Sequence, residues 1–325
     1  MSSEISKMFL GVDVGSISTN LALIDESRNL IESVYIRTEG KPVNSVQKGI
    51  RLMREKLARE VEISGAGATG SARQLTGVII GADIVKNEIT AHALASLQIR
   101  PDIHTIIEIG GQDSKIIIIR NGVAVDFAMN TVCAAGTGSF LDMQANRLDI
   151  PIEDFGDLSL KSDNPVSIAG RCTVFAESDM IHKQQLGHPT EDIIKGLCEA
   201  LARNYLNNVG KGKEINPPIM FQGGVAANIG MRDAFKKYLN HDVIVPKHFD
   251  VMGAIGAAIL AQEEMDVRPR KSNFYGWDIP KMNFKTSGFE CDGCPNICEI
   301  VEIKKNGGLI ARWGSRCGKW DLTDQ

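Results

Sequence analysis

A cysteine stands just before a glycine-rich loop in the middle of the chain. Residues 130–148 read NTVCAAGTGSFLDMQANRL, so Cys133 precedes the glycines of AGTG and a segment with helical spacing. Cys172 has the same setting, at the start of CTVFAESDMIHKQQL. A helix N-terminus carries roughly half a positive charge, which lowers the pKa of a thiol there. The pattern therefore favours thiolates at both positions, although spacing alone also fits two unrelated buried cysteines.

One chain offers two such thiolates, whereas a four-iron cluster takes four. A twofold dimer would supply the missing pair, because an isologous interface presents the same patch twice. We expect Phe140, Leu141 and Leu148 to form the buried face of the first helix, and Val174, Phe175 and Met180 that of the second. Cys198, within the amphipathic segment 190–209, is expected to be a core residue.

Four further cysteines crowd the tail. The run FECDGCPNICEIVEIKKNGGLIARWGSRCGKW contains C-x2-C-x3-C, then two strand-like segments around Asn306-Gly307-Gly308, then a last cysteine. Such spacing is typical of a metal site, and a hairpin between the third and fourth ligands resembles a small zinc ribbon. The predicted ligands are Cys291, Cys294, Cys298 and Cys317. The closed hairpin favours zinc over a second iron–sulfur cluster, and free thiols on a loop are the remaining alternative.

Three glycine-rich turns each follow an apolar run: DVGSIST at 13–19, GGQDSK at 110–115 and QGGVAAN at 222–228. Glycine lets the backbone approach a phosphate closely, and successive N–H groups form an anion-binding nest. Nucleotide phosphates arrive with Mg²⁺, which takes carboxylates as ligands. Asp13 and Asp113 are the predicted carboxylates, with Glu108 nearby, and Gln112 could orient an attacking water.

The segments around these turns indicate an internal duplication. Residues 8–38 read as three short strands, and 104–128 repeat the design with an Asn121-Gly122 hairpin. Helical patterns follow in each half, and further strands are expected at 61–67, 217–222 and 242–245. This order predicts an α/β fold with mixed sheets and outer helices. The expected domains are 7–101 with 251–264, then 102–250, then a Cys-rich tail over 265–325.

Composition excludes several classes of protein. The 325 residues carry a formal net charge of -4, with 43% hydrophobic and 23% charged residues, as in an ordinary globular protein. There is no basic stripe for nucleic acid, and no export signal or membrane-spanning run, so we expect a cytoplasmic protein. The six histidines form no ligand-spaced pair. Glu88 and His92 lie four residues apart on one helix face, which favours a pair at the surface over a contact in a cleft.

The motifs GVDVGS, IGGQDSK, CAAGTGSFLD, CTVFAES and GGVAAN together resemble the ATP-dependent activators of 2-hydroxyacyl-CoA dehydratases. The related ATPase subunits of benzoyl-CoA reductase share these motifs, and the BadF/BadG/BcrA/BcrD-type family lies in the actin and sugar-kinase superfamily. The resemblance covers about residues 8–264. It implies duplicated actin-like (ribonuclease H-like) ATPase domains with a small Cys-rich C-terminal extension. Asn20, where a lysine is expected in close relatives, and Glu108, where aspartate is usual, depart from the pattern.

The resemblance also implies roles for individual residues. ATP or ADP with Mg²⁺ would lie in the cleft between the duplicated domains, with Gln112, Asp113 and Asp13 as the catalytic group. The implied nucleotide-binding residues are Gly11, Asp13, Gly15, Ser16, Ile17, Ser18, Gly110, Gly111, Gln112, Gly136, Thr137, Gly138, Gly223, Gly224 and Asn228. One [4Fe-4S] cluster would be shared across a homodimer by Cys133 and Cys172 of each subunit.

The activity implied by this resemblance is ATP-driven transfer of one low-potential electron to a partner iron–sulfur enzyme. That partner would be a 2-hydroxyacyl-CoA dehydratase, a benzoyl-CoA reductase or a double-cubane relative, and a ferredoxin or flavodoxin would donate the electron. Such a protein is oxygen-sensitive and works anaerobically. Two alternatives stay open: an ATP-binding iron–sulfur redox sensor, and a small-molecule kinase of the same superfamily, which would need neither Cys133 nor Cys172.

Overall fold

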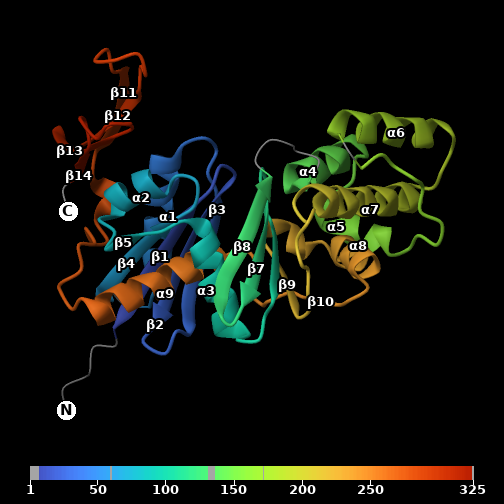
Figure 1. The fold of residues 1–325 in the computed structure, drawn as a ribbon, viewed down its shortest axis with the longest axis horizontal. Coiled ribbons are helices and arrows are strands. Elements are labelled where there is room, and N and C mark those ends of the chain that lie inside the picture. Colours follow the sequence, from blue (N-terminus) through green and yellow to red (C-terminus); the bar gives the residue numbers. More distant parts are fainter. Residues whose placement is uncertain (1–6, 59–60, 131–135, 171, 324–325) are drawn as a thin grey trace. The chain divides into compact units, whose positions relative to one another are not determined.

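The computed structural model describes residues 7–58, 61–130, 136–170 and 172–323, drawn in Figure 1. Its contacts divide the chain into two compact units. The first unit comprises the chain up to Gly15, Thr19–Glu88 and everything from Gly253 onward; the second comprises Ser16–Ser18 and Ile89–Met252. The helix α3 (Glu88–Ile99), expected in the first domain, therefore groups with the second unit.

The first unit contains a five-stranded sheet with the order β3-β2-β1-β4-β5. The strands are β1 (Met8–Val14), β2 (Ser18–Asp25), β3 (Leu30–Arg37), β4 (Ile63–Thr69) and β5 (Ile84–Val85). The meander β1-β2-β3 is antiparallel at β1 and β2, whereas β4 runs parallel to β1. The central strand β1 is buried along nearly its whole length, as its continuous apolar run predicted.

The second unit repeats this arrangement, with the order β10-β9-β6-β7-β8. Its strands are β6 (Thr105–Ile109), β7 (Ser114–Arg120), β8 (Val123–Asn130), β9 (Ile219–Gln222) and β10 (Val243–Ile244). Here β6 and β7 are antiparallel and β9 runs parallel to β6. Read from the other edge, the second order matches the first strand for strand, which confirms the predicted duplication.

Helices follow the strands in both units. The first unit contains α1 (Pro42–Lys56), α2 (Arg73–Ile80) and α9 (Met252–Val267). The second contains α3 together with α4 (Gly138–Arg147), α5 (Ile152–Ser159), α6 (Thr173–Gln185), α7 (Thr190–Asn208), α8 (Ile229–Leu239) and the 3₁₀ turn η2 (Gly224–Ala227). Sequence patterns missed α2 and α5, which are eight residues each and too short to show clear periodicity.

Two strand glycines explain how α9 covers the first sheet. A Cβ on Gly11 would come within 1.9 Å of the Ala254 carbonyl oxygen, and one on Gly67 within 2.1 Å of that of Ala257. The α9 backbone therefore lies directly on β1 and β4, which only glycine permits. Segment 251–264 was expected in the first domain, and α9 packs there. The same contact accounts for Gly11 without a nucleotide.

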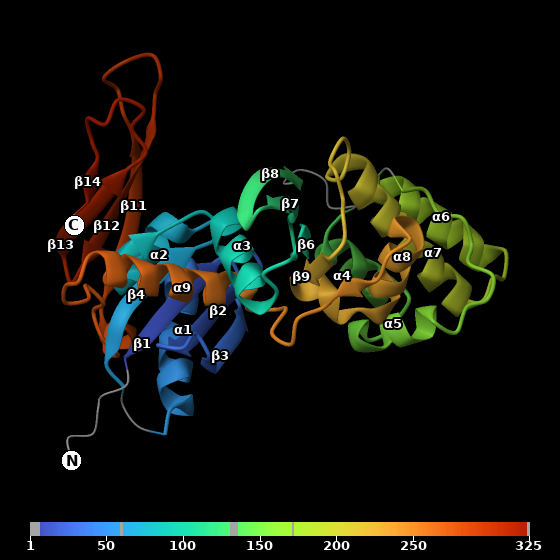
Figure 2. The same cartoon turned by 60° about the horizontal axis from the view of Figure 1, so that its bottom comes forward.

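A third, four-stranded sheet forms the tail of the first unit, seen as the red strands in Figure 2. Its strands are β11 (Phe284–Glu290), β12 (Glu299–Lys305), β13 (Gly308–Trp313) and β14 (Leu322–Thr323), preceded by the short turn η3 (Ile279–Lys281). The predicted hairpin around Asn306 is β12-β13, and β11 and β14 extend it to a sheet. No helix among the described residues is long and apolar enough to cross a membrane.

Candidate functional site

The first predicted phosphate loop follows β1. Asp13 is next to last in that strand and pairs across the sheet with Thr69 at the end of β4. Gly70 follows with φ of 93°, and a Cβ there would lie 2.4 Å from Asp13 Oδ1. A glycine is therefore required where the β4 end approaches the Asp13 carboxylate.

Hydroxyl groups support the turn after Asp13. Thr19 Oγ1 lies 2.9 Å from Thr38 Oγ1 and 2.8 Å from Ser45 Oγ. Thr38 Oγ1 also lies 2.9 Å from the Gly15 carbonyl oxygen and donates to it. Thr19, Thr38 and Ser45 are buried, so this network fixes the backbone at Gly15. Sequence analysis missed it because its three members are distant in the chain.

The second predicted loop joins β6 to β7. The Gly110 N–H donates to the Asp113 carbonyl oxygen at 3.0 Å, which closes a tight turn with Gln112 exposed at its tip. The side chain of Ile17, which groups with this unit, covers Gly111, where a Cβ would lie 2.5 Å away. The turn therefore presents an amide side chain and a half-buried carboxylate, as a water-orienting site requires.

A buried lysine that sequence analysis did not select lies behind this turn. Lys115 Nζ is 2.9 Å from Glu108 Oε2 and 2.9 Å from Asp113 Oδ2. The side chains of Lys115 and Glu108 are 4% and 6% exposed. One ammonium thus lies between two carboxylates. A lysine in an otherwise apolar strand, SKIIII, was the signal in the sequence.

The segment AGTG packs on the same turn. The N–H groups of Gly138 and Ser139, at the start of α4, donate to the carbonyl oxygens of Gly110 and Gly111, each at 2.8 Å. A Cβ on Gly138 would lie 3.0 Å from Val225, in the loop after β9. These contacts bring together three of the predicted nucleotide segments: 110–113, 136–139 and 223–228.

The loop after β9 is built for close approach to β6. Gly223 has φ of 87°, and a Cβ there would lie 2.4 Å from the Ile109 carbonyl oxygen and 2.6 Å from Glu108 Oε1. Gly224, the next residue, is exposed. Asn228 is the N-cap of α8, because its Oδ1 accepts the Met231 N–H at 3.1 Å.

Two buried hydroxyl groups next to the predicted loops suit a polar ligand. Thr69 Oγ1, beside Asp13, and Ser114 Oγ, beside Asp113, have no hydrogen-bond partner within the described ranges. Buried polar atoms normally have a partner, so each is a place for a nucleotide, its Mg²⁺ or an attached water. In each unit, taken by itself, these oxygen atoms are of the kind that fits a phosphate group or Mg²⁺.

His92 is not part of a surface pair, contrary to the sequence prediction. It is buried in α3, and its Nδ1 lies 2.9 Å from Gln222 Nε2, while Ser96 Oγ donates to Gln222 Oε1 at 3.2 Å. Burial, assisted by the charge of Lys115, lowers the pKa of His92 to about 3, so this imidazole is neutral. Helical spacing of Glu88 and His92 could not reveal which face of α3 the sheet covers.

Of the two predicted cluster cysteines, Cys133 lies outside the described residues. Cys172 is the N-cap residue of α6 and is half-buried, with no side-chain capping bond. Met180 is buried as predicted, but Val174 and Phe175 are 66% and 64% exposed, so their assignment to a buried face was wrong. Helical periodicity gives a face but not what covers it. An exposed apolar rim beside a thiol at a helix start fits a metal ligand at an interface.

Helix α7 supports both cysteine segments and the phosphate turn. Asn204 Nδ2 donates to the Gly170 carbonyl oxygen at 2.6 Å, and a Cβ on Gly136 would lie 3.1 Å from Asn204 Oδ1. The next residue, Tyr205, donates its hydroxyl to the Lys115 carbonyl oxygen at 2.7 Å. Burial, followed by the Glu108 charge, raises the pKa of Tyr205, so the phenol stays a donor. Sequence reasoning missed Asn204 and Tyr205 because their partners lie far along the chain.

The other cysteines differ sharply in environment. Cys198 is buried in the core of the second unit, as predicted, and burial raises the pKa of its thiol to about 12. In the tail, Cys291 is buried, Cys298 half-buried, and Cys294 and Cys317 exposed. Within the described ranges, no three Cys, His, Asp or Glu side chains already gather around one point as a metal site requires.

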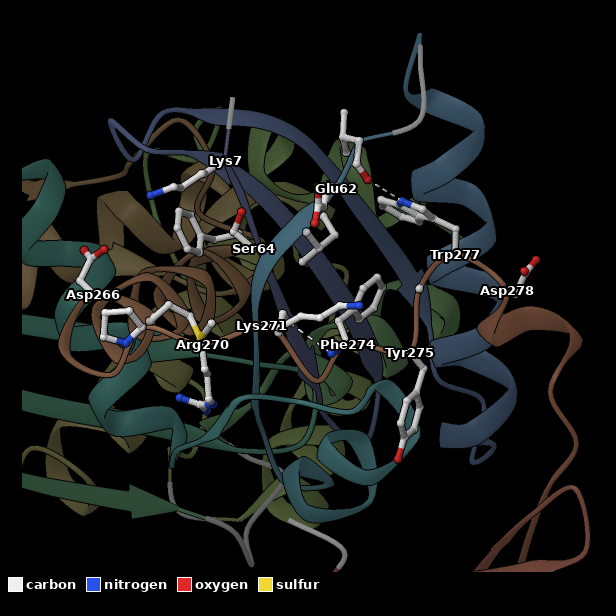
Figure 3. Close-up of a pocket in the computed structure, with 17 residues that line it drawn as sticks. Lys7, Glu62, Ser64, Asp266, Arg270, Lys271, Phe274, Tyr275, Trp277 and Asp278 are labelled. Atoms are coloured by element: carbon white, nitrogen blue, oxygen red, sulfur yellow. Dashed lines mark hydrogen bonds between the residues drawn. The ribbon is translucent and has the colours of Figure 1, made fainter. Parts of the chain in front are cut away.

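A cavity of about 640 Å³ lies elsewhere in the first unit (Figure 3). Phe9 and Ser64, at the starts of β1 and β4, line it together with Arg270, Tyr275 and Trp277. The Trp277 indole donates to the Val61 carbonyl oxygen at 2.9 Å. The predicted phosphate loop follows the opposite ends of these strands, and none of the sequence-predicted site residues lines this cavity.

The duplicated sheets, with glycine turns and acids at their strand ends, define an actin-like ATPase fold. The chain belongs to the BadF/BadG/BcrA/BcrD ATPase family, whose sequence profile matches residues 10–261. This match confirms the resemblance seen in the sequence motifs. The tail from residue 262 onward lies beyond the matched span.

Named relatives and a solved structure agree with this assignment. The chain is 34% identical over 265 residues to the (R)-2-hydroxyglutaryl-CoA dehydratase activating ATPase of Acidaminococcus fermentans, covering 78% of this chain and 97% of that protein. It is 34% identical over 258 residues to the activator of lactoyl-CoA dehydratase of Anaerotignum propionicum, covering 78% and 97%. The activator of 2-hydroxyisocaproyl-CoA dehydratase from Clostridium difficile, solved with bound ADPNP, superposes with a TM-score of 0.74 at 33% identity, covering 80% and 96%.

Proposed function

We propose that this ATPase is an activator of an acyl-CoA dehydratase-type iron–sulfur enzyme, to which it delivers one electron at the cost of ATP. The loop 13–19, and in the second unit the loops 110–115 and 222–228, would each contact Mg-ATP. Asp13 and Asp113 supply carboxylate oxygens toward Mg²⁺, and Gln112 orients the attacking water. The small-molecule kinase is not favoured, because relatives with a named role that match 78% of the chain at 34% identity are activators.

The partner and the cofactor are the finer parts of this proposal. Cys133 and Cys172 of two copies would hold one [4Fe-4S] cluster, which carries single electrons when bound. Cys172 fits this role because it is half-buried at a helix start beside exposed Val174 and Phe175. A ferredoxin or flavodoxin is the proposed electron donor. The four tail cysteines are proposed to hold a second metal site.

The observation that carries the coupling is the pair of hydrogen bonds between the α4 start and the Gly110-Gly111 turn. Because the Gly138 and Ser139 N–H groups bond to that turn at 2.8 Å, a change in the turn's backbone moves the start of α4. Cys133 lies five residues before Gly138 in the sequence. Asn204 of α7 donates to the carbonyl oxygen of Gly170, which lies two residues before Cys172. Nucleotide hydrolysis and the cysteine segments are thereby mechanically connected.

The test is reduction of a purified 2-hydroxyacyl-CoA dehydratase under anaerobic conditions. The chemically reduced protein is mixed with the dehydratase, with Mg-ATP or with Mg-ADP, and electron delivery is followed by visible absorbance. We expect electron delivery only with Mg-ATP, together with ATP hydrolysis. ATP turnover that reduces no such partner would contradict the proposal and favour the redox sensor. Phosphorylation of a sugar by an iron-free protein would instead establish the kinase.

A further inference from the structure

The four tail cysteines share one end of the small sheet. Strand β11 ends at Glu290 and β12 begins at Glu299, and these two residues pair across the ladder. At the same end, β13 closes at Trp313 and β14 opens at Leu322. The loops 291–298 and 314–321 connect these strand ends, and they carry the four cysteines, three in the first and one in the second. Antiparallel pairing thus collects residues that lie up to 26 positions apart in the sequence.

The two loops are packed against each other. The Trp320 indole N–H, from the second loop, donates to Cys291 Sγ in the first at 3.1 Å. The Trp320 ring also meets Phe289 edge to face, with ring centroids 5.2 Å apart. The first loop is closed by the Cys291 N–H, which donates to the Cys298 carbonyl oxygen at 2.8 Å. The backbone segments that carry the four thiols are therefore already ordered next to each other.

Cys291 has the hydrogen bonding expected of a metal-bound sulfur. Besides Trp320, the backbone N–H of Gly293 approaches its sulfur at 3.5 Å. Donors on a thiolate sulfur orient it and offset its charge, as outer-shell partners do in metal centres. The ammonium of Lys319 lies over the Trp320 ring, 5.2 Å from its centroid, and adds a positive charge beside the same loop.

The small sheet has little apolar core of its own. Between Phe284 and Leu322, all of which is described, the buried apolar side chains are Cys291, Ile300, Ile303 and Ala311. A unit of about 40 residues usually needs a staple such as a metal or disulfides. The open end of this sheet, where the cysteine loops lie, is where such a staple would act.

We propose that the tail binds one zinc ion through Cys291, Cys294, Cys298 and Cys317. Zinc takes four thiolates in closed structural sites, with ligand pairs spaced as C-x2-C. Cys294 and Cys317 are exposed, so their thiols can turn toward Cys291 and Cys298 without displacing packed side chains. Binding closes the two loops over the metal and releases the thiol protons of the ligands.

This site deepens the proposed function but is separable from it. The tail lies outside the span shared with the family, and its loops contain none of the nucleotide or cluster residues. Loss of the tail metal should therefore leave ATP hydrolysis intact. If the protein delivered no electron to a dehydratase, the tail should still contain its zinc.

The first experiment is metal analysis of the full chain. The protein is produced in cells grown with zinc and iron and is purified without oxygen. We expect one zinc per chain, falling to near zero in each of C291S, C294S, C298S and C317S. The matched control C198A, at a buried cysteine outside the tail, should keep its zinc. Cobalt substitution of the native chain should give the intense thiolate-to-cobalt absorption of a four-sulfur site. A metal-free tail would overturn the proposal, as would roughly six irons per chain without zinc, which would mean a second cluster.

The second experiment removes one hydrogen-bond donor while keeping an aromatic ring. W320F eliminates the indole N–H at Cys291, and we expect about a 10- to 100-fold weaker zinc affinity in chelator competition. W313F, in β13 of the same sheet, is the matched control and should bind zinc like the native protein. Equal zinc affinity of W320F and W313F would overturn the role assigned to Trp320.

Discussion

The buried ion group behind the second phosphate loop gives the sharpest prediction for the ATPase. Lys115 lies 2.9 Å from both Glu108 and Asp113, with its side chain 4% exposed. Lys115→Met keeps the length of the side chain but removes the ammonium that lies 2.9 Å from the buried Glu108 carboxylate. Breaking a buried pair in this way costs about 3–5 kcal/mol. For a unit of this size we expect the unfolding midpoint to fall by roughly 6–20 °C.

The assay is thermal unfolding without nucleotide, followed by circular dichroism, beside ATP turnover. Lys213→Met is the matched control, because Lys213 pairs with Asp126 at 2.7 Å and the Asp126 side chain is 52% exposed to solvent. Its loss should cost less than about 1 kcal/mol. The double variant Glu108→Gln with Lys115→Met removes both charges and should recover most of the stability. It should not recover full ATP turnover, since Asp113 then lacks its partner.

This prediction would be wrong if Lys115→Met unfolded at the same temperature as Lys213→Met. It would also be refuted if the double variant were no more stable than Lys115→Met, because the buried Glu108 charge would then not be the cause.

Four further predictions follow from individual contacts. Gln112→Ala should lower kcat for ATP by about a hundredfold with little change in KM, in steady-state assays; unchanged kcat would remove Gln112 from the chemistry. Gly11→Ala should destabilise the chain by about 3 kcal/mol or more in urea unfolding because α9 leaves no room for a Cβ, whereas Gly308→Ala, with its nearest contact at 3.7 Å, should not. Asn204→Ala should keep most ATP turnover but lose electron delivery per ATP, and a proportional loss of both would contradict its linking role. The pKa of His92 is about 3, below the ordinary 6.5, so the stability that neutral His92 contributes above pH 6.5 is lost as the pH falls toward 3. Over this range the unfolding free energy should drop by up to about 1.4 kcal/mol per pH unit more in the native protein than in His92→Asn. Parallel curves of unfolding free energy against pH for the two proteins would contradict this.

Local patterns predicted the parts of the fold that depend on local physics. The apolar runs before DVGS and EIGG are strands because β1 and β6 are buried on both faces. The glycine turns of the second unit could be predicted from the sequence. A turn that packs closely against its neighbours leaves no room for a Cβ, so it requires glycine, as at Gly223. The duplicated order of strands followed from the repeated meander.

Features that depend on distant partners could not be predicted in this way. Lys115 reads as one charge in a strand until Glu108 and Asp113 are folded beside it. Val174 and Phe175 have the spacing of a core face, yet they are exposed. Helical periodicity identifies a face of a helix but not what covers that face. The tail cysteines reveal a metal motif by spacing, but only the pairing of β11 to β14 shows that their loops share one end of a sheet.

Cys133 and Cys172 of two copies are proposed to hold one inorganic cluster. The direct test is to measure iron and acid-labile sulfide per chain in the oxygen-free dimer. The proteins compared are the native protein, C133S, C172S and C198A. We expect about two irons and about two sulfides per chain in the native protein and in C198A, and loss of both in C133S and C172S. A native protein without iron, or C172S that retains its full iron and sulfide, would contradict it.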